Sequence, residues 1–164
     1  KVPGFDKRYT DIWIMEPHPI AIELKYKPIS TILEVNKECF ELKQQGAQDL
    51  GRYDVLKDLQ RVEDIVKKYP STTGYVILLT NDHLYWDKSV KINSVDEEFK
   101  IHEGQDIHGT LTWSNQAGKG TIKNRETPLQ IHGHYSAKWK QYSKIDHKSG
   151  EIKKLSFKIS HHSD

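Results

Sequence analysis

Three charged residues near the start of the chain have the types and spacing needed to act on a phosphate ester. Asp11 lies in one short apolar segment, and Glu23 and Lys25 lie two residues apart in the next. Carboxylate oxygens are ligands that Mg²⁺ prefers, and a bound ion could polarise a phosphodiester and generate a hydroxide nucleophile. An ammonium group beside them could position the attacking water or offset charge that develops on the phosphorane oxygens.

The elements that would position these side chains are two strands joined by a turn. Residues 9–15 and 20–26 are rich in strand formers, and the prolines of residues 16–19 exclude a helix between them. An antiparallel hairpin is therefore expected. Because side chains alternate along a strand, Glu23 and Lys25 share one face, predicted to border a cleft. The opposite face, with Ile20, Ile22 and Leu24, is predicted to meet a core, and the Leu24 carbonyl is a further candidate metal ligand.

A helix and a buried strand are predicted after this hairpin. Residues 31–35 and 39–43 indicate a second small hairpin, although Leu33-Glu34-Val35 would also tolerate a helix. Apolar residues then recur at steps of three and four over residues 48–69, which predicts an amphipathic helix that Pro70 ends. Its apolar positions are Leu50, Tyr53, Leu56, Leu59, Val62, Ile65, Val66 and Tyr69, and its expected i,i+3 ion pairs are Asp49/Arg52, Asp54/Lys57 and Asp58/Arg61.

The nearly continuous apolar run of residues 73–79 is typical of a strand buried on both faces, which the helix would reach as a crossover connection. Residues 87–109 lack a clear pattern and residues 114–120 indicate a loop, whereas residues 131–139 and 151–159 indicate further strands. Neither a repeat nor a domain boundary is evident. We therefore expect one domain over residues 1–164, with a core at about 8–80 and a β-rich extension at about 81–164.

Asp11, the strand Ile20-Ala21-Ile22 and the motif Glu23-Leu24-Lys25 resemble the PD-(D/E)XK motif of the restriction-endonuclease-like nuclease superfamily. Further segments resemble a group of poorly characterised bacterial members. They are residues 46–54, residues 56–61, Trp139 and Tyr142-Ser143. The sequence departs from the motif in having Thr10, not proline, before Asp11. The superfamily core also usually begins with a helix before the first strand, and this chain has no room for one ahead of Asp11.

The resemblance implies an α/β (α+β) fold with a mixed central sheet flanked by helices, without the N-terminal core helix. It implies a metal-dependent nuclease that hydrolyses DNA, with Mg²⁺ or Mn²⁺ as cofactor. Many such nucleases work as homodimers, although no dimer face is evident in this sequence. By similarity, Asp11 and Glu23 bind the metal and Lys25 is the catalytic lysine. Gln48, Arg52 and Lys27 are candidate nucleic-acid contacts beside the site, because a helix N-terminus favours anions. The sequence does not decide whether the substrate is DNA or RNA, or whether cleavage is endonucleolytic or exonucleolytic.

Structural alternatives exist for each of these features. Glu23 and Lys25 could form an ordinary surface ion pair, and Gln48 and Arg52 could serve helix capping and pairing. The fold could also persist in a catalytically inactive module that binds nucleic acid or has a structural role. His132 and His134 have spacing suited to a metal, but no third ligand is evident. Seven lysines near the C-terminus could follow a nucleic-acid backbone or simply keep the surface soluble: Lys138, Lys140, Lys144, Lys148, Lys153, Lys154 and Lys158.

Composition narrows the class of protein. Lys and Arg total 25 against 23 Asp and Glu, so a nucleic-acid partner must be held by a local patch and not by net charge. Cys39 is the only cysteine, which excludes an intrachain disulfide and a Cys-based zinc site. No apolar run approaches the ~20 residues of a membrane span, and a cytoplasmic location is expected. The start at Lys1 instead of Met suggests that further residues precede this segment.

Overall fold

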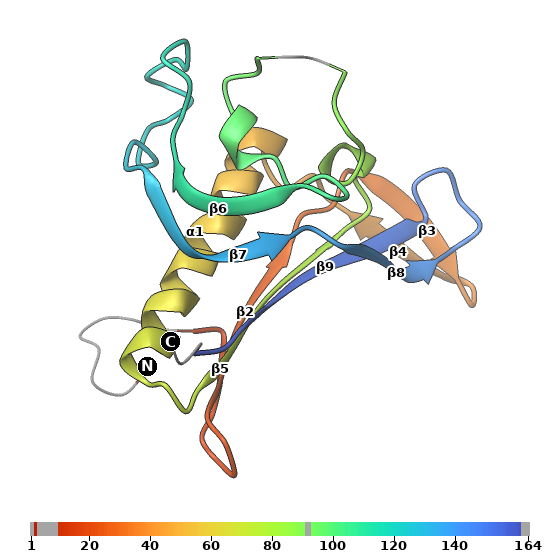
Figure 1. Ribbon diagram of the computed structural model, residues 1–164. Coiled ribbons are helices and arrows are strands. Elements are labelled where there is room, and N and C mark those ends of the chain that lie inside the picture. The colour runs from red at the N-terminus through yellow and green to blue at the C-terminus, as the bar shows by residue number, and fades with distance from the viewer. Residues whose placement is uncertain (1, 3–9, 91–92, 162–164) are drawn as a thin grey trace.

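The computed structural model describes residue 2, residues 10–90 and residues 93–161 of the chain. These residues form a mixed α+β fold with one α-helix, a mixed five-stranded sheet and two small two-stranded sheets (Figure 1). The elements are β1 (Ile12–Ile14), β2 (Ile20–Tyr26), β3 (Thr31–Val35), β4 (Glu38–Leu42), α1 (Gln48–Lys68), β5 (Thr73–Thr80), the 3-10 turns η1 (His83–Tyr85) and η2 (Glu97–Phe99), β6 (Asp106–Leu111), β7 (Leu129–Ser136), β8 (Trp139–Lys144) and β9 (Glu151–Ile159).

The N-terminal hairpin forms as the sequence predicts, with a shorter first strand. β1 pairs antiparallel with β2, and Ile12 lies opposite Ile22. The predicted first strand began at residue 9, which lies outside the described residues; Thr10 and Asp11 precede β1. The second predicted hairpin is also confirmed. β3 and β4 pair antiparallel around Asn36 and Lys37, whose positive φ angles of 54° and 67° suit a tight two-residue hairpin turn.

The predicted crossover is confirmed: β2 runs parallel to β5, and the chain between them passes through α1. The central sheet has the strand order β1-β2-β5-β9-β8, with β9 antiparallel to both β5 and β8. Helix α1 ends at Lys68, two residues before Pro70, and Leu56, Leu59 and Val62 on it are fully buried. Opposite this sheet, α1 also contacts β7, so the helix is covered from two sides.

The orientation of β2 corrects the sequence prediction. Glu23 and Lys25 do share a face, but that face is directed toward α1, where Ala21 is fully buried and Glu23 only 2% exposed. Ile20 and Ile22 are half-buried on the other face, and Leu24 is 45% exposed. The alternation of apolar residues predicted the wrong face of β2 as the buried one. The charged face can be buried because α1 supplies partners of opposite charge for its side chains.

The strand β5 is covered less completely than predicted. Gly74, Val76, Leu78 and Thr80 on the α1 side are buried, whereas Tyr75, Ile77 and Leu79 on the other side are half-buried. Within the described residues α1 is the sole α-helix, and it covers one face of the sheet. The expected arrangement of helices flanking the sheet is therefore found on one side only. None of these helical segments is long and apolar enough to cross a membrane.

The C-terminal half is richer in strands than the sequence pattern indicates. The predicted strand at residues 131–139 is two strands, because β7 ends at Ser136 and β8 begins at Trp139 in a different sheet. β6 falls in a region without an evident pattern and pairs with β7 across a register shift between Ile107 and Gly109. Residues 114–120 form a loop, as predicted. One hydrophobic cluster joins this half to the core, and its aromatic centre is Tyr53, Phe99 and Trp113.

Candidate active site

Asp11 and Glu23 lie across the N-terminal hairpin from each other. Ile12 is opposite Ile22, so the same register continued by one residue places Asp11 opposite Glu23. The Leu24 amide donates a hydrogen bond of 2.7 Å to Asp11 Oδ2, which holds this exposed carboxylate against the edge of β2. The structure thus brings together the two carboxylates that the sequence analysis paired.

The Leu24 backbone faces Asp11, as a shared metal site would require. The N–H and C=O of one strand residue point toward the same neighbouring strand, so the Leu24 carbonyl lies on the side to which its amide donates. The Leu24 side chain is on the other face of the sheet and takes no part. Two carboxylates and one carbonyl would present hard oxygen ligands, the type that Mg²⁺ and Mn²⁺ prefer.

Glu23 is a buried carboxyl group with one satisfied oxygen. Its Oε2 lies 2.6 Å from Arg61 Nη2, while its buried Oε1 has no hydrogen-bond partner among the described residues. Burial is the main cause that raises the Glu23 pKa to about 7; Arg61 opposes the rise, and the charges of Asp58 and Asp11 add to it. An orphaned buried oxygen beside a second carboxylate fits a site that takes a cation.

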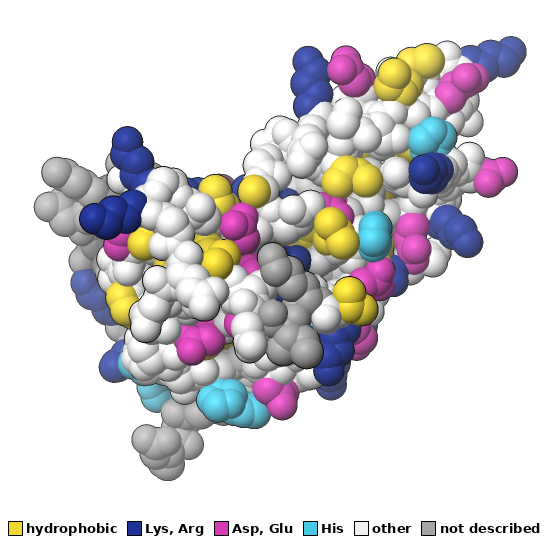
Figure 2. Space-filling model, turned by 90° about the horizontal axis from the view of Figure 1, so that it is seen from above, with side chains coloured by type: hydrophobic (Ala, Val, Ile, Leu, Met, Phe, Trp, Pro, Cys, Tyr) yellow, Lys and Arg dark blue, Asp and Glu magenta, His cyan; other side chains and the backbone are white. Residues whose placement is uncertain are grey.

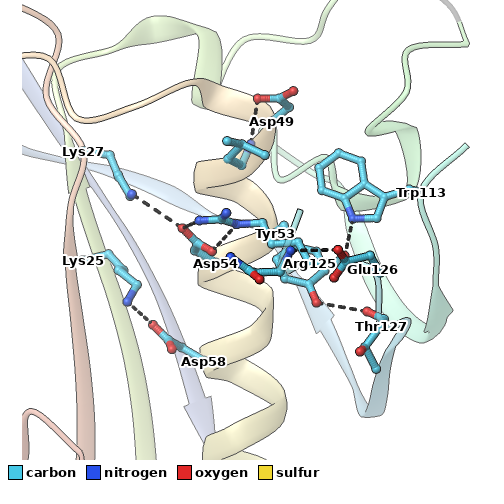
Figure 3. A network of polar contacts seen from close by, with 12 residues as sticks. Lys25, Lys27, Asp49, Tyr53, Asp54, Asp58, Trp113, Arg125, Glu126 and Thr127 are labelled. Atoms are coloured by element: carbon cyan, nitrogen blue, oxygen red, sulfur yellow. Dashed lines mark hydrogen bonds and ion pairs between the residues drawn. The ribbon is translucent and has the colours of Figure 1, made fainter. Parts of the chain in front are cut away.

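Lys25 is held by a carboxylate from the helix. Its Nζ lies 2.7 Å from Asp58 Oδ2, as Figure 3 shows, and the other oxygen of Asp58 lies 2.8 Å from Arg61 Nη2. The Asp58 side chain is 6% exposed, against 28% for Lys25. The lysine therefore enters the same cluster as Glu23, but from a face covered by α1 instead of an open cleft.

The contacts between β2 and α1 form a ladder of ion pairs. Figure 3 shows Lys25 of β2 and Lys27, the residue that follows β2, pointing toward α1, where Lys27 Nζ lies 3.8 Å from Asp54. Steps of two residues along a strand cover about 6.6 Å, and steps of three or four along a helix cover about 4.5–6 Å, so successive rungs stay aligned. The rungs are Glu23–Arg61, Lys25–Asp58 and Lys27–Asp54.

Sequence reasoning missed Asp58 and Arg61 as partners across the ladder. The charge order in the sequence could have indicated these partners. Residues 23, 25 and 27 are an acid followed by two bases, and residues 61, 58 and 54, taken in that order, are a base followed by two acids. Of the predicted i,i+3 pairs, Asp58/Arg61 forms. The other two are wrong, because Arg52 pairs with Asp96 and Asp54 with Arg125. The Arg125 guanidinium binds both Asp54 oxygens, at 2.8 and 3.0 Å.

The structure does not bring the predicted phosphate contacts of α1 next to the carboxylates. Arg52 precedes Arg61 by nine residues, about 13 Å along the helix axis. Its guanidinium is buried, 2.5 Å from Asp96 Oδ2 and 2.6 Å from the Leu84 carbonyl oxygen. The Gln48 amide donates to Asp82 at 2.8 Å. Both side chains therefore bind the segment after β5, instead of the capping and pairing within the helix that was the structural alternative for them.

The C-terminal lysines do not form one surface. Lys140 lies opposite Lys154 on β8 and β9, whereas Lys153 points to the other face, with its Nζ 4.7 Å from the Trp86 ring centroid. On the side of the molecule seen in Figure 2, Lys and Arg side chains are interspersed with Asp and Glu. The seven C-terminal lysines therefore do not together form one continuous basic surface.

The described residues contain no group of three or more His, Cys, Asp or Glu side chains arranged to hold a metal ion as they stand. His134 stacks on His108, with ring centroids 4.5 Å apart, and His132 is exposed. An ion at Asp11 and Glu23 would thus depend on two carboxylates, the Leu24 carbonyl and water, a set that suits Mg²⁺ because it keeps several waters. Comparison with protein-family models, curated proteins and solved structures finds no match to this chain.

Proposed function

We propose that this protein is a metal-dependent nuclease of the PD-(D/E)XK type that hydrolyses phosphodiester bonds in DNA. The observation that carries the proposal is that Asp11 binds the Leu24 amide beside Glu23, while Glu23 and Lys25 both face α1 and Glu23 Oε1 is buried without a hydrogen-bond partner among the described residues. Perturbed carboxyl groups of this kind gather at functional sites more often than elsewhere.

In this proposal the roles follow from position. Asp11, Glu23 and the Leu24 carbonyl would hold Mg²⁺ or Mn²⁺, which when bound polarises the phosphodiester and lowers the pKa of a coordinated water. Lys25 would orient the attacking water and offset negative charge on the phosphorane. Asp58, 2.7 Å from the Lys25 Nζ, would keep that ammonium directed at the carboxylates.

A restriction-endonuclease-like core belongs to the same proposal. It is supported by the order of the elements: a β1–β2 hairpin that carries Asp11 and Glu23, then α1, then a strand parallel to β2. DNA as the partner, a homodimer and a cytoplasmic location are further parts of the proposal. Among the predicted nucleic-acid contacts, the Lys27 side chain is 19% exposed, against 9% for Arg52.

One observation favours a second function, a non-catalytic module that binds nucleic acid or has a structural role. Glu23 and Lys25 of β2, and Lys27 just after it, each have a partner of opposite charge on α1. An ion-pair ladder of this kind can hold a strand to a helix without any chemistry. In that case the motif residues would be structural, and the cleavage of DNA would not depend on them.

Plasmid nicking distinguishes the two functions. The full chain is incubated with supercoiled DNA in Mg²⁺, in Mn²⁺ and in EDTA, beside Glu23→Ala and the control Glu34→Ala, which removes an exposed acid from β3. The nuclease proposal expects nicking by the parent and the control in either metal, and none by Glu23→Ala or in EDTA. Metal-independent nicking, or no nicking by the parent in any metal, contradicts it.

A further inference from the structure

Arg61 joins two carboxylates that come from different elements. One nitrogen, Nη2, lies 2.6 Å from Glu23 Oε2 on β2 and 2.8 Å from Asp58 Oδ1 on α1. The two oxygens are therefore no more than 5.4 Å apart. This nitrogen has the surroundings of a bound cation, with anionic oxygens on both sides.

The two carboxylates are deeply buried, which separates them from an ordinary surface acidic cluster. The side chains of Glu23 and Asp58 are 2% and 6% exposed. Glu23 Oε1 lacks a hydrogen-bond partner among the described residues although it is shielded from water. A buried carboxylate oxygen left without a donor is costly, so a cation that bound both Glu23 oxygens would remove that cost.

The formal charges of the cluster suit an exchange of cations. Asp11, Glu23 and Asp58 carry three negative charges when ionised, and Lys25 and Arg61 carry two positive charges. If a divalent ion replaced Arg61, the ion and Lys25 would supply three positive charges and balance the three carboxylates. A divalent ion added beside Arg61 would instead leave the cluster with an excess of one positive charge.

We propose that Arg61 and a divalent metal ion compete for the carboxylates of Glu23 and Asp58, so that Asp58 is a third carboxylate ligand and Arg61 must turn away when the ion binds. The inference rests on the proposed nuclease function, since it concerns the same metal site. It assigns to α1 a direct part in metal binding and makes Arg61 a resident counter-cation that limits metal affinity.

The surroundings of Arg61 allow this movement. The side chain is 37% exposed and lines a pocket of about 310 Å³ together with Gln60, Lys57 and the loop residues Asn124 and Thr127. Two oxygens on one Mg²⁺ are at most about 4.2 Å apart, because each metal–oxygen distance is about 2.1 Å. The Glu23 and Asp58 oxygens, now no more than 5.4 Å apart, would have to lie within about 4.2 Å of each other once the guanidinium leaves.

Calorimetric titration of the full chain with Mn²⁺ tests the competition without relying on cleavage. Arg61→Gln keeps a polar side chain and removes the charge, and Arg61→Ala removes the group. The matched control is Arg125→Gln, which also deletes an arginine paired with an α1 carboxylate, Asp54, outside the cluster. The proposal predicts that both Arg61 variants bind Mn²⁺ about tenfold more tightly than the parent, while Arg125→Gln binds as the parent does.

The reverse change identifies Asp58 as a ligand. Asp58→Asn should bind Mn²⁺ about tenfold more weakly than the parent, even though it also frees Arg61 from one partner. Circular dichroism of each variant confirms that it is folded. Equal or weaker Mn²⁺ binding by folded Arg61 variants overturns the competition, and so does parent-like binding by Asp58→Asn. Absence of Mn²⁺ binding by the parent and by both Arg61 variants instead overturns the metal site and with it the proposed function.

Discussion

Lys25 Nζ lies 2.7 Å from Asp58 Oδ2, so the lysine of the Glu-Leu-Lys motif is anchored by a helix that begins more than twenty residues later in the sequence. This contact ties the motif to the packing of α1 against the sheet. Any change in how the helix packs should therefore alter the position of the motif, and several consequences of that packing can be measured.

Glu23 should make the metal-free protein less stable at high pH. The folded carboxyl keeps its proton up to about pH 7, because burial raises its pKa above the ordinary value of 4.5. Between about pH 4.5 and about pH 7, unfolding therefore releases a proton from Glu23, and the free energy of unfolding falls as the pH rises through this range. Urea unfolding in EDTA should show that the parent loses about 2–3 kcal/mol more than Glu23→Gln between about pH 5 and about pH 8.

Glu34→Gln is the control for this pH dependence, since Glu34 is exposed on β3. It should follow the parent. If Glu23→Gln and the parent lose the same stability over this range, the buried carboxyl does not titrate as described.

The contact between β5 and α1 should be intolerant of an added methyl group at Gly74. A Cβ there would lie 2.3 Å from Val62 Cγ1 and 3.2 Å from Ile159 Cβ. Gly74→Ala should lower the free energy of unfolding by about 1–3 kcal/mol, the usual cost of overpacking. Gly120→Ala is the matched control because its Cβ would meet nothing within 4 Å. Equal denaturation midpoints for the two variants would refute the close packing of β5 on the helix.

Leu59 tests the apolar side of the helix. It is fully buried in the main hydrophobic cluster, so Leu59→Ala should cost about 2–5 kcal/mol of unfolding free energy. Lys57→Ala, at an exposed position one half-turn away, should change it by less than about 0.5 kcal/mol. The account of the core is wrong if urea melting gives Leu59→Ala the stability of the parent.

Glu63 should join α1 to β7. Its carboxylate accepts hydrogen bonds from the His132 and Gly133 amides, at 3.0 and 2.7 Å, and from the Tyr135 hydroxyl at 2.9 Å. Glu63→Ala leaves these donors without their acceptor and should cost about 2–4 kcal/mol, because hydrogen bonds to charged groups are worth ~1.5–3 kcal/mol each and are not additive. Hydrogen exchange should show faster exchange at the two amides; unchanged protection there would contradict the role of Glu63.

The sequence predicts those parts of the fold that depend on local period and turn chemistry. The α1 helix has a 3.6-residue apolar repeat and a proline beyond its end, and the Asn36-Lys37 turn joins two strand-forming segments. Both are found as predicted. β6 was missed because its pairing with β7 is long-range and its own sequence, Asp106 to Leu111, has little strand character.

The sequence predicts which candidate site residues share a strand face, but it does not predict which element covers that face. The two-residue spacing of Glu23 and Lys25 requires a shared face, and the hairpin requires Asp11 to approach them. The direction of that face depends on where α1 packs, which strand alternation cannot specify. The partners Asp58 and Arg61 follow from helix packing, so they emerge only when the helix and the strand are considered together.

The central claim is that Asp11, Glu23 and Lys25 form a metal-dependent phosphodiesterase site, and Lys25→Ala tests it most directly. The measurement is the initial rate of plasmid nicking at a Mn²⁺ concentration that saturates both the parent and the variant, with occupancy established by calorimetry. The account predicts that Lys25→Ala binds Mn²⁺ yet nicks DNA at least about a hundredfold more slowly, since it keeps the ligands and loses the group that supports the nucleophile. Nicking by Lys25→Ala at the rate of the parent would contradict the account.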